Sequence, residues 1–267
     1  YSIFDYMEYK IFNVPTSTWT DFFPVLTNTN MSLRTSLRGT RPHKWFSPTR
    51  FATLSPRWYY TLLNYLMAVI VRLHGQFYPF PEVVPVDDPS PIVRWIVKTL
   101  EEHGRCMMGM TVSRALRLSI TAQELGLDLT GTVFIVGGEP STDSKIKMIE
   151  ASGAIHVSQF SFTEAGTIAI ACSQPNPKGD MHFMSNHMAM IQRPVTVHDQ
   201  TVDALCLTTL MPFSPKTLLN AQTDDFGTVE VRDCGCPLYE LGFDRHIYNL
   251  RSYRKLTGEG VTLVGTD

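Results

Sequence analysis

Two glycines that follow an apolar stretch give the most direct signal for ligand chemistry in this sequence. Residues 132–136 are apolar and largely β-branched, which predicts a buried strand. Gly137 and Gly138 come next, and glycine lets the backbone turn sharply and approach a ligand closely. Ligands of open α/β sheets bind at the carboxyl ends of strands, so this turn is a candidate binding loop. A glycine turn after a strand is also common without any function.

A second polar loop is expected after the next strand. Ser141 and Thr142 are favourable helix caps, Asp143 suits a first helical turn, and Gly153 ends the helix that this pattern predicts. Residues 154–157 then read as a strand, followed by a loop over residues 160–166. We expect both loops to lie at the same edge of the sheet.

Three cysteines and one histidine form a candidate metal set. Cys172 lies a short way before His182, and Cys234 and Cys236 form a Cys-x-Cys pair. Three cysteines with one histidine are an accepted ligand set for structural zinc. The spacing differs from the usual Cys-x₂-Cys pairs, so two surface turns with free thiols are an alternative reading.

The two loops together resemble a known family. Val-Gly-Gly-Glu-Pro at residues 136–140, followed by Phe-Ser-Phe-Thr-Glu-Ala-Gly at residues 160–166, is similar to the motif pair of adenylate-forming enzymes. The resemblance is to the branch of the phenylacetate-CoA ligases and their acyl-protein synthetase-like relatives. Helices that alternate with short apolar strands agree with its fold. We therefore expect an α/β fold of mostly parallel sheets flanked by helices, with a β-rich C-terminal part.

The resemblance implies a role for each matching residue. In that family the first motif packs on adenine, and the matching residues are Gly137, Gly138, Glu139 and Pro140. The second motif stacks an aromatic ring on the base, touches phosphate and places a carboxylate on Mg²⁺. The matching residues are Phe160, Ser161, Thr163 and Glu164. Thr163 and Glu164 are the predicted catalytic residues.

The family's glycine-rich phosphate loop corresponds to residues 35–44. Such loops work because glycines expose backbone N–H groups to phosphate oxygens. Here Leu37 and Thr40 replace both glycines. The candidate phosphate contacts are therefore a degenerate set: Ser36, Arg38, Gly39 and Thr40. A basic surface turn explains these residues equally well, and the departure puts catalytic competence in question.

Two later segments complete the resemblance. Residues 220–227 resemble the family's ribose-binding loop, and Asp225 takes the place of the aspartate that accepts hydrogen bonds from the ribose hydroxyls. Residues 250–261 resemble the hinge before the family's small lid domain, and Arg251 is the matching nucleotide contact. The implied division is an adenylation domain over residues 1–250 and a hinge over residues 251–267. We expect this chain, which ends at Asp267, to lack the lid.

Composition limits the other function classes. The formal net charge is −2, which argues against a nucleic acid or an anionic membrane as partner. No apolar run reaches membrane-spanning length, and no secretion signal is recognised. Five cysteines are an odd number, which argues against a disulfide framework and fits the cytoplasm.

The predicted function is the ATP-dependent activation of a carboxylic acid as acyl-adenylate, with transfer to a thiol of coenzyme A, a carrier protein or a cysteine. ATP and Mg²⁺ are the implied cofactors, with a structural Zn²⁺, because some relatives share the cysteine–histidine pattern. The substrate acid and the thiol acceptor are the expected partners, and a homodimer is a further expectation. The alternative is a non-catalytic subunit that binds a nucleotide or acyl group and keeps a degenerate phosphate loop.

Overall fold

The computed structural model describes residues 15–20, 42–48, 58–73, 79–162, 164–197, 200–211, 216–253, 255–258 and 261–264. Its helices are α3 (Trp58–Leu73), α4 (Ser90–His103), α5 (Val112–Glu124), α6 (Asp143–Glu150) and α7 (Pro237–Glu240). Its strands up to the middle of the chain are β1 (Thr16–Trp19), β2 (Pro42–Ser47), β3 (Pro81–Val83), β4 (Cys106–Thr111), β5 (Thr132–Gly137), β6 (Ile155–Phe162) and β7 (Gly166–Ala171). The later strands are β8 (Met181–Phe183), β9 (Met188–Val197), β10 (Gln200–Thr209), β11 (Ala221–Val231), β12 (Arg245–Ser252), β13 (Lys255–Gly258) and β14 (Val261–Val264).

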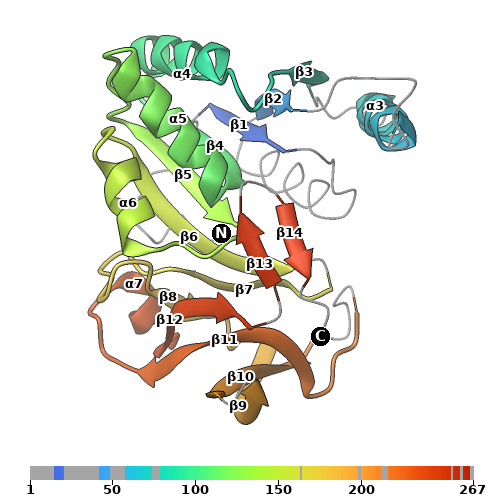
Figure 1. Cartoon of the computed structure of the whole chain (residues 1–267), viewed down its shortest axis with the longest axis vertical. Coiled ribbons are helices and arrows are strands. Elements are labelled where there is room, and N and C mark those ends of the chain that lie inside the picture. Colours follow the sequence, from blue (N-terminus) through green and yellow to red (C-terminus); the bar gives the residue numbers. More distant parts are fainter. Residues whose placement is uncertain are drawn as a thin grey trace.

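One large sheet organises the described residues. Its strand order is β3-β2-β1-β4-β5-β6-β7-β8-β12-β11-β10-β9, and β13 pairs with β14 separately (Figure 1). Every pairing from β3 to β6 is parallel. Every pairing from β6 to β9 is antiparallel. Strand β6 is therefore the strand at which the pairing changes from parallel to antiparallel.

Helices α4, α5 and α6 cover the parallel half because they alternate with its strands along the chain. They contact one another in sequence, and each contacts a strand of the parallel half (Figure 1). Helix α5 turns Ala115, Leu118 and Ala122 inward, one helical turn apart, onto a core that contains Phe134 and Ile96. This packing fixes where β5 and β6 end, and hence the position of the loops that follow them.

The antiparallel half has its own core. Strands β9 and β10 form a long hairpin in which Gln200 lies opposite Val197. Leu205 and Leu207 of β10 pack with Ile168 of β7 and Ile247 of β12. The described residues thus form a helix-covered parallel sheet that continues into an antiparallel region, where Leu238 of the short helix α7 packs with Ile170 and Ala171 of β7.

The expected α/β class and the β-rich C-terminal part are confirmed by this topology. The sheet as a whole is mixed, because the antiparallel half is as long as the parallel one. The predicted boundary after residue 250 falls inside β12, and the division of the chain at this point stays a prediction. No helix in the described ranges has the length and apolar character that crossing a bilayer requires.

Candidate functional site

The turn after β5 requires glycine at both of its positions. A Cβ atom on Gly137 would lie 2.7 Å from the backbone oxygen of Gln159, which is far closer than carbon and oxygen pack. Gly138 has φ of 77°, a left-handed conformation that glycine adopts without strain. The turn can therefore lie directly against β6, because neither position carries a side chain.

Glu139 locks this turn onto helix α5. Its carboxylate accepts a hydrogen bond from the backbone N–H of Ser113 at 2.9 Å and another from the Ser113 hydroxyl at 2.7 Å. Ser113 belongs to the first turn of α5, where backbone N–H groups lack helical partners and a negative charge is favoured. Glu139 is thus a structural anchor, and the backbone from Gly138 to Pro140 is the part offered to a ligand.

A cavity of about 900 Å³ lies beside this turn and the end of β6. Its walls come from residues 138–144, residues 158–162 with Glu164, residues 178–179 with Met181, residues 222–225 of β11 and residues 249–252 of β12. The cavity is large enough for a nucleotide-sized ligand. It lies where the sheet changes from parallel to antiparallel, beyond the carboxyl end of β5.

Most of the predicted nucleotide-site residues line this one cavity: Gly138, Glu139, Pro140, Phe160, Ser161, Glu164, Asp225 and Arg251. Gly137 supports the turn from behind and is outside the lining. The predicted catalytic Thr163 and the degenerate phosphate-loop residues Ser36, Arg38, Gly39 and Thr40 lie outside the described residues. The structure therefore brings together the adenine-, ribose- and magnesium-associated parts of the predicted site.

Residues 160–162 form a strand rather than the predicted loop. Phe160 lies opposite Ala169 and Ser161 opposite Thr167, in the antiparallel pairing of β6 with β7. The register shifts between Phe160 and Ser161. Such a bulge re-aims the side chains at the end of a strand. Exposed Glu164 follows in the turn to β7, so only the last part of the expected loop is a loop.

The predicted ribose loop is also a strand. Asp225 lies within β11 opposite Ser252, and its neighbour Phe226 lies opposite Arg251. Asp225 and Arg251 therefore lie on adjacent strands, one residue apart in the register. The hydroxyl of Thr223 accepts a hydrogen bond from the Asp225 backbone N–H at 3.3 Å. A carboxylate on a paired strand is held more rigidly than one on a free loop.

Charge within the cavity is predominantly negative. Its acidic lining residues are Glu139, Asp143, Glu164, Asp224 and Asp225. The cations of the lining are Lys178 and Arg251, and Lys178 is ion-paired with Glu150. An acidic cavity suits a phosphate ligand that arrives with a divalent cation, since carboxylate oxygens are preferred Mg²⁺ ligands. Sequence reasoning missed Lys178, because nothing local to it indicates the cavity.

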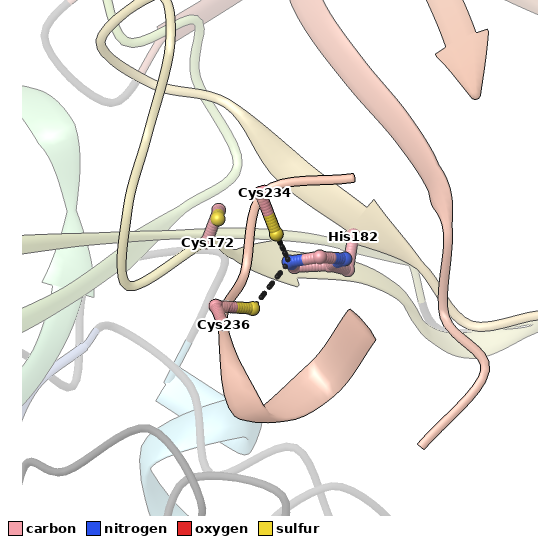
Figure 2. Close-up of side chains that lie close together, drawn as sticks. All are labelled: Cys172, His182, Cys234 and Cys236. Atoms are coloured by element: carbon pink, nitrogen blue, oxygen red, sulfur yellow. Dashed lines mark hydrogen bonds between the residues drawn. The ribbon is translucent and has the colours of Figure 1, made fainter. Parts of the chain in front are cut away.

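The four predicted zinc ligands form a compact cluster (Figure 2). One ligand atom from each of Cys172, His182, Cys234 and Cys236 lies within 4.8 Å of all the others. His182 Nε2 lies 3.0 Å from Cys236 Sγ and 3.6 Å from Cys234 Sγ. In a tetrahedral zinc site the sulfurs lie about 3.8 Å from one another and about 3.5 Å from the histidine nitrogen, given Zn–S of about 2.3 Å and Zn–N of about 2.0 Å. The residue types and their 4.8 Å span fit a zinc ion, and the contact between Cys236 Sγ and His182 Nε2 would lengthen on binding.

Hydrogen bonds around the cluster prepare it for a cation. The Nδ1–H of His182 donates to the backbone oxygen of Phe243 at 2.6 Å, which leaves Nε2 with its lone pair toward the sulfurs. Burial lowers the pKa of His182 to about 4, so its ring is neutral at pH 7. Burial also raises the pKa of the Cys172 and Cys234 thiols. These thiols stay protonated unless a metal ion displaces their protons.

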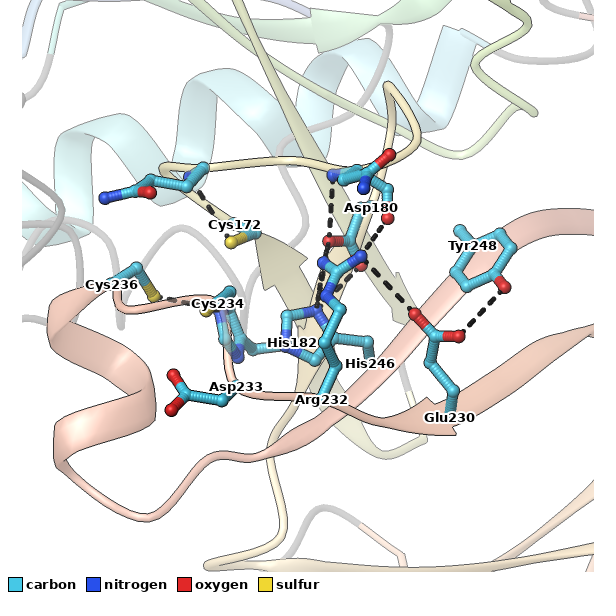
Figure 3. Close-up of polar contacts among 12 residues, drawn as sticks. Cys172, Asp180, His182, Glu230, Arg232, Asp233, Cys234, Cys236, His246 and Tyr248 are labelled. Atoms are coloured by element: carbon cyan, nitrogen blue, oxygen red, sulfur yellow. Dashed lines mark hydrogen bonds and ion pairs between the residues drawn. The ribbon is translucent and has the colours of Figure 1, made fainter.

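A buried charged network lies next to the cysteine–histidine cluster (Figure 3). Asp180 is fully buried and pairs with both His246 and Arg232. Arg232 also donates to the backbone oxygen of Asn176. The network therefore ties β11 and β12 to the loop that carries Lys178 and Gly179 into the cavity. It is a positioning network that sequence reasoning did not find, because its members are far apart along the chain.

Solved structures that resemble this one include those of the following three proteins. The first is the luciferase-like enzyme from the nonluminescent mealworm Zophobas morio; the match covers 93% of this chain and 51% of that protein, at 11% identity and a TM-score of 0.45. The second is an acyl-CoA synthetase (AMP-forming)/AMP-acid ligase II-like protein from Dyadobacter fermentans; the match covers 90% of this chain and 58% of that protein, at 16% identity and a TM-score of 0.42. The third is coronafacic acid ligase from Pectobacterium brasiliense; the match covers 96% of this chain and 72% of that protein, at 10% identity and a TM-score of 0.39.

This chain spans about half the length of the first two of these proteins. The name of the second describes an AMP-forming acyl-CoA synthetase-like protein, and the name of the third describes an acid ligase. No model of a known family matches the chain, and no curated protein does.

Proposed function

We propose that the cavity binds an adenosine nucleotide and that the chain is part of an enzyme that activates a carboxylic acid as acyl-adenylate. The observation that carries the proposal is the convergence of separate motifs on one cavity. The glycine turn after β5, the end of β6, and the facing ends of β11 and β12 all line it. These segments are far apart in sequence, and each resembles a motif that contacts a part of the same ligand.

Each wall of the cavity has a chemical role in this proposal. The backbone of residues 138–140 and the ring of Phe160 form the surfaces against which the base packs. Asp225 accepts hydrogen bonds from the ribose hydroxyls, a task that suits a group with acceptors only. Arg251, on the adjacent strand β12, contacts ribose or phosphate. Ser161 and Glu164 lie at the phosphate end, and Thr163 is assigned to phosphate by its motif.

The proposed reaction needs no nucleophile from the protein. A carboxylate oxygen of the substrate attacks the α-phosphorus of ATP, the bond from that phosphorus to the bridging oxygen breaks, and pyrophosphate leaves. Catalysis of this kind consists of positioning and charge stabilisation. A magnesium ion, when bound, neutralises charge on the transferring phosphoryl group, and exposed Glu164 with its acidic neighbours would hold it.

The finer parts of the proposal concern partners and surroundings. The acyl group passes from the adenylate to a thiol of coenzyme A, a carrier protein or a cysteine. Residues 1–250 form the adenylation domain, and residues 251–267 form the hinge. Zinc at the cysteine–histidine cluster is structural, because four protein ligands leave no open position for substrate. The free cysteines fit a reducing compartment, for which we propose the cytoplasm.

A non-catalytic nucleotide-binding subunit is the second candidate function. The replacement of both phosphate-loop glycines by Leu37 and Thr40 favours it. This alternative keeps the base and ribose contacts and loses the transfer step. It therefore predicts tight binding of AMP with no gain from the two further phosphates of ATP.

Calorimetry tests the proposal. The wild-type chain should bind AMP, and Asp225→Ala should weaken that binding by about 1–3 kcal/mol because the ribose hydroxyls lose their acceptor. Asp203→Ala, an exposed aspartate on β10 away from the cavity, is the matched control and should bind AMP as the wild type does. Glu164→Gln should keep AMP binding and lose acid-dependent release of pyrophosphate from ATP. A wild-type chain that binds neither AMP nor ATP–Mg²⁺ contradicts the proposal.

A further inference from the structure

The loop between β7 and β8 reaches both the cysteine–histidine cluster and the cavity. Cys172 directly precedes it and His182 lies just beyond its end, so two of the four candidate zinc ligands flank it. Between them, Lys178 and Gly179 line the cavity. We call residues 173–180 the linking loop. The proposed function gives this loop no role.

Strand β8, at the end of the linking loop, has one residue at each site. Met181 lines the cavity, and the next residue, His182, directs Nε2 to the sulfurs of Cys234 and Cys236. Adjacent residues of a strand point to opposite faces, so the two sites lie on either side of β8. The strand is only three residues long and pairs with β12 over two residue pairs. A displacement at His182 therefore reaches the cavity wall through a single peptide unit.

The tip of the linking loop packs against the glycine turn of the cavity. A Cβ atom on Gly179 would lie 3.7 Å from the backbone oxygen of Ser141 and 3.3 Å from Cδ1 of Ile146 on α6. Ser141 directly follows residues 138–140, whose backbone packs on the base in the proposed function. The loop therefore supports the surface on which the ligand rests.

Buried contacts join the same loop to the cysteine–histidine cluster. The backbone oxygen of Asp180 accepts a hydrogen bond from the backbone N–H of Cys172 at 2.9 Å. The Asp180 carboxylate is fully buried and pairs with Arg232 and His246 (Figure 3). The ring of His246 lies against that of His182, with 4.2 Å between the centroids. Asp180 thus connects the loop to a cysteine and to the histidine of the cluster.

Zinc binding acts on this loop in two ways. An ion held by both Cys172 and His182 joins the two ends of the loop, which removes conformations that the loop could otherwise adopt. His182 Nε2 lies 3.0 Å from Cys236 Sγ, whereas a tetrahedral zinc holds such a pair about 3.5 Å apart. The ion therefore displaces β8 or residues 234–236 slightly, and β8 carries its share to Met181.

We propose that zinc at the cysteine–histidine cluster tightens the binding of the nucleotide in the cavity, because it fixes the linking loop against the turn at residues 138–141. Asp180 is the positioning residue that joins the two sites. A ligand that meets an already ordered wall loses less conformational entropy when it binds. The inference rests on the proposed function for the identity of the ligand, and it adds control of that binding by a metal ion.

Calorimetry with AMP on the zinc-loaded chain and on the chain stripped by a chelator tests the inference. The comparison is made at a temperature at which circular dichroism shows both forms folded. The zinc-loaded chain should bind AMP at least about fivefold more tightly. Coupling of two binding sites is reciprocal, so saturating AMP should raise the affinity for zinc by the same factor, as measured by competition with the chelator.

Asp180→Asn should still bind zinc and AMP, and it should bring the ratio of the two AMP affinities close to one. Glu150→Gln is the matched control: Glu150 also pairs with a cation, Lys178 of the loop, but it is exposed and does not line the cavity. It should keep the wild-type ratio, because an exposed ion pair contributes little. Hydrogen exchange of the wild type gives a readout that needs no variant, since zinc alone should slow the amides of residues 173–180.

Equal AMP affinities of the zinc-loaded and zinc-free wild type overturn this inference and leave the proposed function standing. A ratio that survives Asp180→Asn, or exchange in residues 173–180 that zinc does not change, also overturns it. Failure of both forms to bind AMP or ATP–Mg²⁺ overturns the proposed function and this inference together.

Discussion

Loss of the zinc ligands should destabilise the protein by an amount that chain connectivity sets. Cys172 follows β7, and Cys236 precedes α7, so an ion that joins them closes a loop of about 65 residues. If the zinc is treated as a simple cross-link, the chain-entropy relation gives about 4 kcal/mol. A change of 1 kcal/mol shifts the melting temperature by about 2–4 °C in domains of this size. Cys236→Ser should therefore lower Tm by about 8–16 °C.

The assay is thermal unfolding combined with metal analysis of the same samples. Wild-type protein should contain one zinc per chain, and Cys236→Ser should contain much less. Cys206→Ser is the matched control, because Cys206 is also a buried cysteine but lies on β10 away from the cluster. It should keep its zinc and lose only the stability that a buried serine costs. Wild-type protein without stoichiometric zinc, or equal Tm losses in both variants, would refute the reasoning.

Three further outcomes are expected from the same geometry. Gly137→Ala should cost about 1–3 kcal/mol of stability and weaken AMP binding, because the new Cβ would meet a backbone oxygen at 2.7 Å. Gly126→Ala is the control: it is strained at φ of 65° but lies in open space, so it should lose stability and leave AMP binding unchanged. Urea unfolding measures the stability of both variants, and calorimetry measures their AMP binding. Asp180→Asn should cost about 3–5 kcal/mol in urea unfolding because it leaves Arg232 without its buried partner, and a loss below 1 kcal/mol would contradict that pairing. Burial lowers the pKa of His156 to about 4 in the folded state, against 6.5 in the unfolded state, so the folded state binds the proton less readily. The stability should therefore fall by about 2–3 kcal/mol between pH 6.5 and 4. His156→Leu should flatten that part of the stability–pH curve, and an unchanged slope would contradict the lowered pKa.

The parallel half of the fold was predictable because its signals are local. The apolar run before Gly137 predicted β5, and the cap residues and Gly153 predicted α6. Helix α5 shows the same principle, since its inward residues recur once per turn. Such periodicity depends only on neighbours in the sequence, so one sequence is enough to recognise it.

The antiparallel half was harder to predict because its pairing is not local. Asp224, Asp225 and Gly227 are common turn residues, and they were read as a loop. In the fold they belong to β11, which is held between β10 and β12 by hydrogen bonds to residues far along the chain. Tertiary pairing overrides a weak local preference in such a case.

The candidate site shows the same division. Most of the motif residues that the structure describes line one cavity, and the cysteine–histidine set came together although its spacing is unusual. Lys178 and the pairing of Asp180 with Arg232 had no local signal. Their roles depend on where the loop between β7 and β8 packs, which only the three-dimensional structure gives.

The most direct test of the central claim is a crystal structure of the chain with AMP bound. The account predicts the base against residues 138–140 and the ring of Phe160, with both ribose hydroxyls within hydrogen-bond distance of the Asp225 carboxylate. It also predicts the phosphate toward Glu164 and Arg251. A nucleotide bound outside this cavity, or one bound inside it with its ribose away from Asp225, would contradict the account.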